Sequence, residues 1–84
     1  MKMIKLDRRH NLYRNGYQYA FLFTEYGQDV PNSYEVERYV RNAEGLEWYD
    51  HTFYGKQKKG QTRTPFYVGF RNESTATIVR LKLA

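Results

Sequence analysis

Apolar and polar positions alternate most clearly in two short segments of the chain. In residues 17–23, Tyr and Phe occupy every second position, and the positions between them are partly apolar. Because neighbouring side chains of a strand point to opposite faces, this pattern predicts a central strand covered on both sides. Pro65 opens a second predicted strand, Phe66–Phe70, and a weaker alternation predicts a short strand over Lys2–Leu6.

The clearest helical pattern begins after Pro31. Asn32 and Glu35 have the spacing of a capping box, with Ser33 as an alternative cap, and Gly45 provides a stop. Apolar residues then recur at the i, i+3, i+4 and i+7 positions of an amphipathic helix, as Val36, Tyr39, Val40 and Ala43. We interpret the charged positions on the other side of this helix as a solvated surface: Glu37, Arg38, Arg41 and Glu44.

The segment between the first two predicted strands fits two local structures. Asp7 can cap a short helix over residues 8–14, which Gly16 would end in the left-handed conformation. Alternatively, Asn15 and Gly16 form the two-residue turn of a β-hairpin. We favour the helix because the first half of the segment shows no alternation.

The C-terminal segment is also ambiguous. We expect a short helix over Glu73–Ile78, capped by Asn72, and then an edge strand over Val79–Leu83. A single strand over Thr75–Leu83 is the alternative, because Thr, Ile and Val favour sheets.

The expected elements follow the order β-α-β-α-β-β-α-β, with an aromatic, extended segment over Leu46–Tyr54 as the third strand. This interleaving predicts an α+β fold in which a small mixed sheet has two or three short helices packed on one face. The 84 residues are enough for a single domain spanning residues 1–84. Nine Tyr, five Phe and one Trp supply the large side chains that a core of this size needs.

Charge is distributed unevenly along the chain. Residues 1–24 carry +4, residues 25–50 carry −5 and residues 51–84 carry +6, for a total of +5. If the two ends fold together, they create a positive surface that attracts anionic partners. The alternative is that the acidic middle neutralises the basic ends within the fold.

The strongest candidate site is the polar segment between Gly55 and Thr64, which contains no apolar residue. It carries four basic side chains within eight residues and no acid: Lys56, Lys58, Lys59 and Arg63. Lysines on a surface loop suit contact with phosphates, and flanking rings such as Tyr54 and Tyr67 suit stacking with bases. Arg8 and Arg9 would extend the positive surface. We therefore expect this loop to bind nucleic acid, either DNA or RNA; the alternative is a solvated hairpin loop flanked by core rings.

A second candidate surface lies in the acidic middle of the chain. Tyr26 and Tyr34 lie there among carboxylates that include Glu35 and Glu37. Because Tyr is enriched in protein interfaces, this patch is the alternative site, and its partner would be a protein.

Several kinds of chemistry have no support in the sequence. The chain has no cysteine and no phosphate-binding loop, nucleophile elbow or zinc-protease motif, so we predict no enzymatic activity and no cofactor. His10 and His51, the two histidines, are not spaced for metal binding with carboxylates, and we interpret His51 as a structural or surface residue. No apolar stretch approaches the length of a membrane span, and the lack of cysteines favours the cytoplasm.

One region resembles short uncharacterised proteins of tailed bacteriophages. The resemblance is carried mainly by residues 65–73, Ala76-Thr77 and Leu81-Lys82-Leu83. It covers about a quarter of the chain, and it assigns no site residue. What it implies is a location in the cytoplasm of an infected bacterium and, as the alternative to nucleic-acid binding, a role as an inhibitor or adaptor that binds a host or defence protein.

Overall fold

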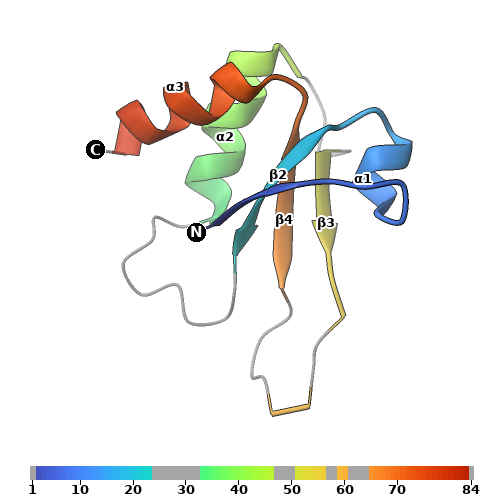
Figure 1. Ribbon diagram of the computed structural model, residues 1–84. Helices are drawn as coiled ribbons and strands as arrows, with labels where there is room; N and C mark the ends of the chain where they lie inside the picture. Colours follow the sequence, from blue (N-terminus) through green and yellow to red (C-terminus); the bar gives the residue numbers. More distant parts are fainter. Residues whose placement is uncertain (1, 24–32, 47–50, 57–58, 61–64, 84) are drawn as a thin grey trace.

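A computed structural model describes residues 2–23, 33–46, 51–56, 59–60 and 65–83 of the chain (Figure 1). Within these ranges, four strands form one sheet and three helices pack against it. In chain order the elements are β1 (Lys2–Lys5), α1 (Asn11–Arg14), β2 (Tyr19–Phe23), α2 (Ser33–Glu44), β3 (Thr52–Tyr54), β4 (Phe66–Phe70) and α3 (Glu73–Leu83).

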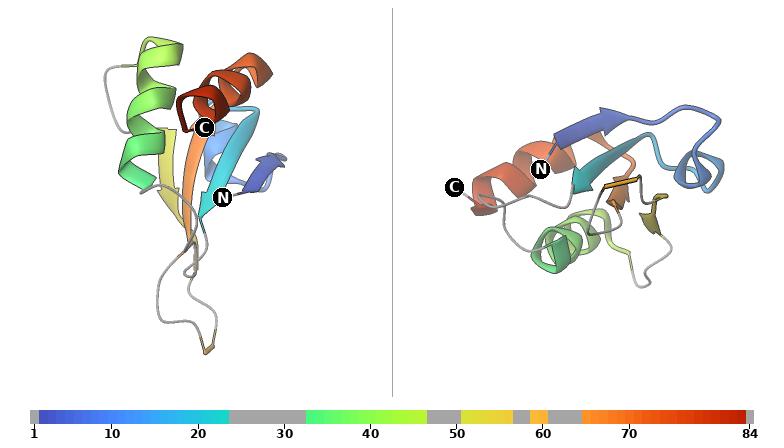
Figure 2. Two further views of the ribbon diagram at one scale, coloured as in Figure 1. Left: turned by 90° about the vertical axis from the view of Figure 1, so that its left-hand side faces the viewer. Right: turned by 90° about the horizontal axis from the view of Figure 1, so that it is seen from below.

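The strands are arranged in the order β1-β2-β4-β3, and each neighbouring pair is antiparallel. Helices α2 and α3 lie on one side of this sheet, and the short helix α1 lies on the other side (Figure 2). The predicted α+β fold is therefore confirmed. Two details differ from the prediction: the sheet is antiparallel instead of mixed, and the three helices are divided between its two faces.

The larger core lies between the central strands and the two long helices. Phe21 of β2 pairs with Val68 of β4, and Phe70 pairs with Tyr19, so that these rings point toward α2 and α3. Side chains with no exposed surface meet there from both layers: Phe21, Val36, Val40, Val68, Phe70 and Val79. Because burying one such side chain stabilises a fold by about 1.5–3 kcal/mol, this core fixes the positions of both helices.

The opposite face carries a smaller core beneath α1. Leu12 and Tyr17 are buried there together with Ala20 of β2. Gly69 of β4 permits this approach, because a Cβ atom at that position would lie 3.1 Å from Leu12 Cδ1 and 3.2 Å from the Tyr17 ring. The predicted helix is present, but it begins at Asn11 instead of residue 8, because the Nδ1 atom of His10 accepts a hydrogen bond from the Leu12 N–H and caps it.

The end of α2 is joined to the start of α3 through one carboxylate. Gly45 ends α2 with a φ of +67°, and the N–H of Leu46 donates to the carbonyl of Arg41 at 2.9 Å. The Glu44 carboxylate accepts hydrogen bonds from the N–H of Arg71, the side-chain amide of Asn72 and the hydroxyl of Thr75. Glu44, which the sequence pattern assigned to a solvated surface, is thus a connection between two helices.

The prediction for the C-terminal segment was wrong beyond residue 78. One helix runs from Glu73 to Leu83, with neither the expected edge strand nor the alternative single strand. Thr75, Ala76 and Val79 are buried along one side of it, at a spacing that a helix brings onto a single face. Burial of this stripe against α2 and the sheet outweighs the preference of Thr, Ile and Val for strands.

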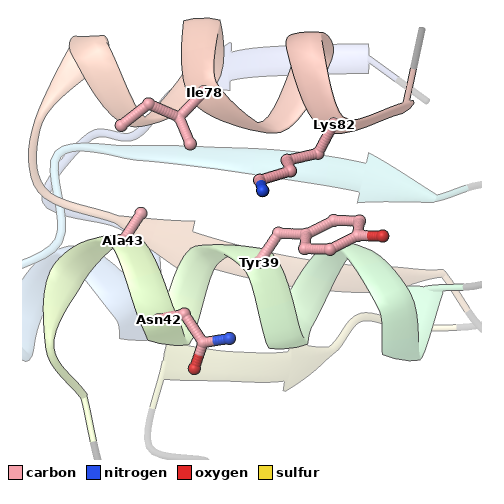
Figure 3. Close-up of a pocket in the computed structure, with 5 residues that line it drawn as sticks. All are labelled: Tyr39, Asn42, Ala43, Ile78 and Lys82. Carbon is pink, nitrogen blue, oxygen red and sulfur yellow. The ribbon is translucent and has the colours of Figure 1, made fainter.

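Helices α2 and α3 lie side by side and leave a groove between them (Figure 3). Its volume is about 310 Å³. Ile78 and Lys82 point from α3 toward α2, where Tyr39 and Ala43 lie below them. Asn42 of α2 completes the lining.

The helical assignment of α3 can be tested with two truncations. Val79 is fully buried, whereas Leu81 is 72% exposed. We expect Val79→Ala to lower the free energy of unfolding by about 2 kcal/mol and Leu81→Ala to change it by less than about 0.5 kcal/mol. Urea denaturation measures both. In an edge strand the two side chains would point to the same face, so equal losses would contradict the helix.

Candidate nucleic-acid interface

The candidate basic segment connects β3 to β4 as the end of a hairpin. The N–H of Gly55 donates to the carbonyl of Pro65 at 2.8 Å, so the pairing of the two strands continues one step beyond Tyr54. Lys56 and Lys59 are exposed. Figure 1 shows Lys59 and Gly60, in orange, beyond the ends of the strands. Both lysines are therefore accessible to a large ligand.

Tyr54 is the last residue of β3, directly before the connection to β4, and it lies beside Tyr34 from the start of α2. The two rings are 59% and 61% exposed. Partial desolvation, the nearby Tyr34 and a hydrogen bond between the two side chains raise the pKa of Tyr54. The Tyr54 ring also packs against Phe66, with 4.8 Å between centroids and 60° between the planes. The interaction between Tyr54 and Tyr34 joins a residue of the predicted nucleic-acid site to one of the predicted protein site.

Tyr67 lies on the other face of the sheet from Tyr54. It pairs with Phe53, and neighbouring residues of a strand face opposite sides. Its ring is partly buried and packs edge-to-face against His10, with 4.6 Å between centroids. The His10 ring also contacts Phe53 at 5.3 Å. Tyr67 therefore helps to hold α1 against the hairpin, and the structure does not bring it together with Tyr54.

Arg8 and Arg9 precede α1 in an exposed turn. The Asp7 carboxylate accepts a hydrogen bond from the N–H of Arg9 at 2.8 Å, and the Asp7 carbonyl accepts one from the N–H of His10 at 3.0 Å. His10, which follows both arginines in the chain, packs on Tyr67, so this turn lies on the same side of the sheet as α1. The predicted residues therefore divide between the two faces of the sheet, with Tyr54 on one face and Tyr67 on the other.

The basic residues at the two ends of the chain are not neutralised by the described part of the acidic middle. Among pairs of described residues, ion pairs within 4 Å join Glu37 to Arg41 and to His51 and no others. The described basic side chains of the two ends are all exposed: Lys2, Lys5, Arg8, Arg9, Arg14, Lys56, Lys59, Arg71, Arg80 and Lys82. They are spread over β1, the α1 region, the hairpin and α3, so the positive charge faces solvent over several elements.

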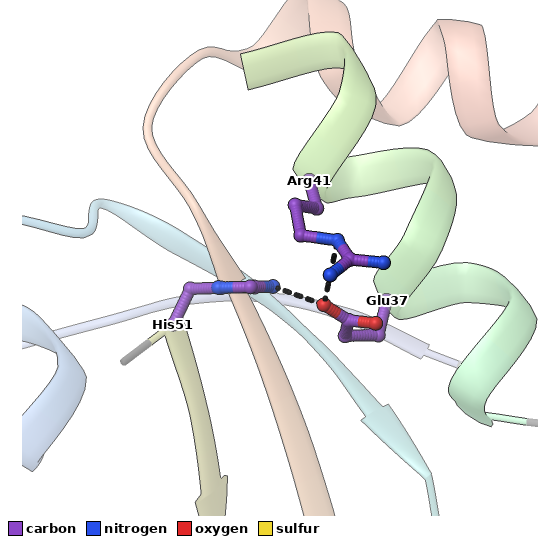
Figure 4. A network of polar contacts seen from close by, with 3 residues as sticks. All are labelled: Glu37, Arg41 and His51. Carbon is purple, nitrogen blue, oxygen red and sulfur yellow. Dashed lines mark ion pairs between the residues drawn. The ribbon is translucent and has the colours of Figure 1, made fainter. Parts of the chain in front are cut away.

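Glu37 was predicted to lie on a solvated surface and, in the alternative, in a protein interface; both predictions were wrong. Its side chain is 3% exposed and lies between α2 and β3 (Figure 4). Glu37 Oε1 is 3.1 Å from Nε2 of the fully buried His51 and 3.5 Å from Nε of Arg41. His51 is thus a structural residue, and this buried group links α2 to the start of β3.

Three of the candidate residues, Tyr26, Lys58 and Arg63, lie outside the described residues. Glu35, from the alternative protein site, is exposed on α2 as expected. The proximity of Tyr34 to Tyr54 was not predicted. Those residues are far apart in sequence, and only the packing of α2 on the sheet brings them together.

Comparisons with protein-family models, with curated proteins and with solved structures find no match for this chain. Within the described ranges, no three side chains of the metal-binding types are grouped so that they could hold an ion. In the same part of the chain, no helix has the length and apolar character needed to cross a membrane.

The buried position of Glu37 predicts unequal effects for two neighbouring acids of α2. Removing one member of a buried charged group leaves its partners unsatisfied. We expect Glu37→Ala to lower the free energy of unfolding by about 3 kcal/mol, and Glu35→Ala, on the exposed side, to change it by less than about 0.5 kcal/mol. Urea denaturation of both variants checks this, and equal small effects would mean that Glu37 is solvated.

The environment of His10 leads us to predict that the protein is less stable in mild acid. Burial lowers its pKa below the usual 6.5, and the opposing effect of Asp7 is smaller. The unfolded chain therefore binds the proton more readily, and stability falls as the pH drops through about 6.5. Protonation also removes the Nδ1 lone pair that caps α1. We expect the urea concentration at the midpoint of unfolding to decrease as the pH is lowered from about 7.5 to about 5.5.

The matched variant for this test is His10→Asn, because Asn also caps helices but does not titrate. Its midpoint should change less over the same pH interval, although the loss of ring contacts with Phe53 and Tyr67 lowers its stability at every pH. An equal pH dependence in both proteins would assign the effect to another group.

Proposed function

We propose that this protein binds single-stranded nucleic acid at the end of the β3–β4 hairpin. The backbone phosphates would contact Lys56, Lys58, Lys59 and Arg63, and bases would stack on the exposed ring of Tyr54. The observation that carries the proposal is that the described basic residues of both chain ends are exposed and unpaired with described carboxylates.

The internal contacts of two acids of the middle segment support this electrostatic argument. Glu37 is enclosed with Arg41 and His51, and Glu44 is bound to the start of α3. Neither is available to neutralise a lysine of the hairpin. A surplus of exposed positive charge attracts a polyanion and speeds its association.

The aromatic residues beside the end of β3 support the choice of a single-stranded nucleic acid over a duplex. Tyr34 and Tyr54 are both more than half exposed, and the Tyr54 ring packs edge-to-face against Phe66. Stacking requires a base whose face is accessible, as in single strands, and each stacked base contributes about 1–3 kcal/mol.

The proposal is tested by titrating fluorescein-labelled oligonucleotides of DNA and RNA with the full chain at several salt concentrations. We expect measurable affinity at about 50 mM salt and a steep loss of affinity as salt increases. Lys58→Ala combined with Lys59→Ala should weaken binding and reduce the salt slope by about 1.4, since each phosphate contact to a single strand contributes about 0.7.

The control removes the same charge elsewhere. Lys5→Ala combined with Arg80→Ala alters β1, the edge strand farthest from β3, and α3. This variant should retain the salt slope of the parent protein. Tyr54→Ala should weaken binding without changing the slope. No affinity at about 50 mM salt, or an equal change of slope in both double variants, would overturn the proposal.

A further inference from the structure

The groove between α2 and α3 is separate from the hairpin and has a mixed apolar and basic character. Tyr39 and Ala43 line it from α2, and Ile78 lines it from α3. Lys82 is the charged side chain among its lining residues. Its volume of about 310 Å³ is at the lower end of the range for ligand sites, about 300–1,000 Å³.

Exposed apolar surface continues beyond the groove along α3. Ile78 is 42% exposed and Leu81 is 72% exposed, and residues three positions apart are neighbours on a helix surface. Leu81 does not line the groove, so the apolar surface is larger than the cavity itself. Apolar surface of this kind, bordered by polar groups, is typical of a protein interaction site.

Charge at the groove indicates what kind of partner fits it. Lys82 lies inside, and Arg38 is exposed one turn before Asn42 on the other wall. Glu35 is the exposed acid one turn before Tyr39, so among the described residues the border carries Lys82 and Arg38 as positive charges and Glu35 as a negative charge. A carboxylate beside Lys82 is favourable. A second copy of this chain would bring another Lys82 and a like net charge of +5, which opposes self-association.

We propose that this groove binds an acidic amphipathic helix of another protein. One large apolar side chain of that helix enters the space between Tyr39 and Ile78, and a carboxylate about one turn away pairs with Lys82. A second apolar side chain covers Leu81. The site differs from the nucleic-acid site in location and in the ligand that it recognises.

The test uses synthetic peptides of about 16 residues, or about four helical turns. The first has two central leucines three positions apart, flanked by glutamates; the second has lysines in place of the glutamates; the third has serines in place of the leucines. Each is titrated into the isotope-labelled full chain and followed by amide chemical shifts, with fluorescence anisotropy for affinity.

We expect the first peptide to shift the amide signals of Tyr39, Asn42, Ala43, Ile78 and Lys82. It should bind about tenfold more tightly than either of the other two. Lys82→Glu should reverse the preference, so that the lysine-flanked peptide binds more tightly than the glutamate-flanked one. A general loss of folding cannot produce such a reversal. Gln18→Ala, at an exposed position before β2 and outside both helices, should leave both affinities unchanged.

Three outcomes would overturn the proposal. The first is the absence of shifts at the groove at about 1 mM peptide. The second is an unchanged charge preference in Lys82→Glu. The third is a set of shifts at the groove that depends on protein concentration without peptide, which would identify a second copy as the occupant.

Discussion

The antiparallel pairing of β2 with β4 is the constraint on which the rest of the structure depends. Its register sets Phe21 beside Val68 and Tyr19 beside Phe70, so one face of the central pair is apolar along its whole length. Burial of that face stabilises the fold, and α2 and α3 cover it. The other face receives α1 where Gly69 leaves room. Because β4 also pairs with β3, the same strand fixes the direction of the basic hairpin.

Two acids that the sequence pattern assigned to the surface stabilise this arrangement from within. Glu37 contacts Arg41 and His51 between α2 and β3, and Glu44 connects the end of α2 to the start of α3. Neither of these two carboxylates is available as a counter-charge for the exposed basic residues of the chain ends. The exposed positive charge is thus partly a consequence of how the helices are held on the sheet.

The elements predicted correctly from sequence are those whose local signals agree with their burial. Helix α2 has a stop at Gly45 and an apolar stripe, and β4 has an uninterrupted apolar run after Pro65. The strand predicted over Val79–Leu83 was wrong, as was the alternative strand over Thr75–Leu83, because the packing of the helix overrides the local preference of Thr, Ile and Val for strands.

The sites were harder to predict than the elements, because a site depends on which residues meet across the fold. The charged side of α2 could be identified by its spacing. The spacing did not indicate that His51 would lie against part of this side and bury Glu37. Tyr34 and Tyr54 were assigned to different partners, since nothing in the linear sequence relates the start of α2 to the end of β3. The groove could not be anticipated either, because its α3 wall had been predicted as part helix and part strand.

The two proposed surfaces are connected through α2. Its first turn provides Tyr34, beside the hairpin, and its next turns provide Tyr39 and Asn42 in the groove. Tyr39 follows Tyr34 by five positions, which corresponds to about 7.5 Å along the helix axis. A nucleic acid and an acidic helix are both negatively charged, so if this chain bound both proposed ligands at once, each would weaken the binding of the other by the same factor. Such negative coupling would need no conformational change, because it would follow from the like charge of the two ligands alone.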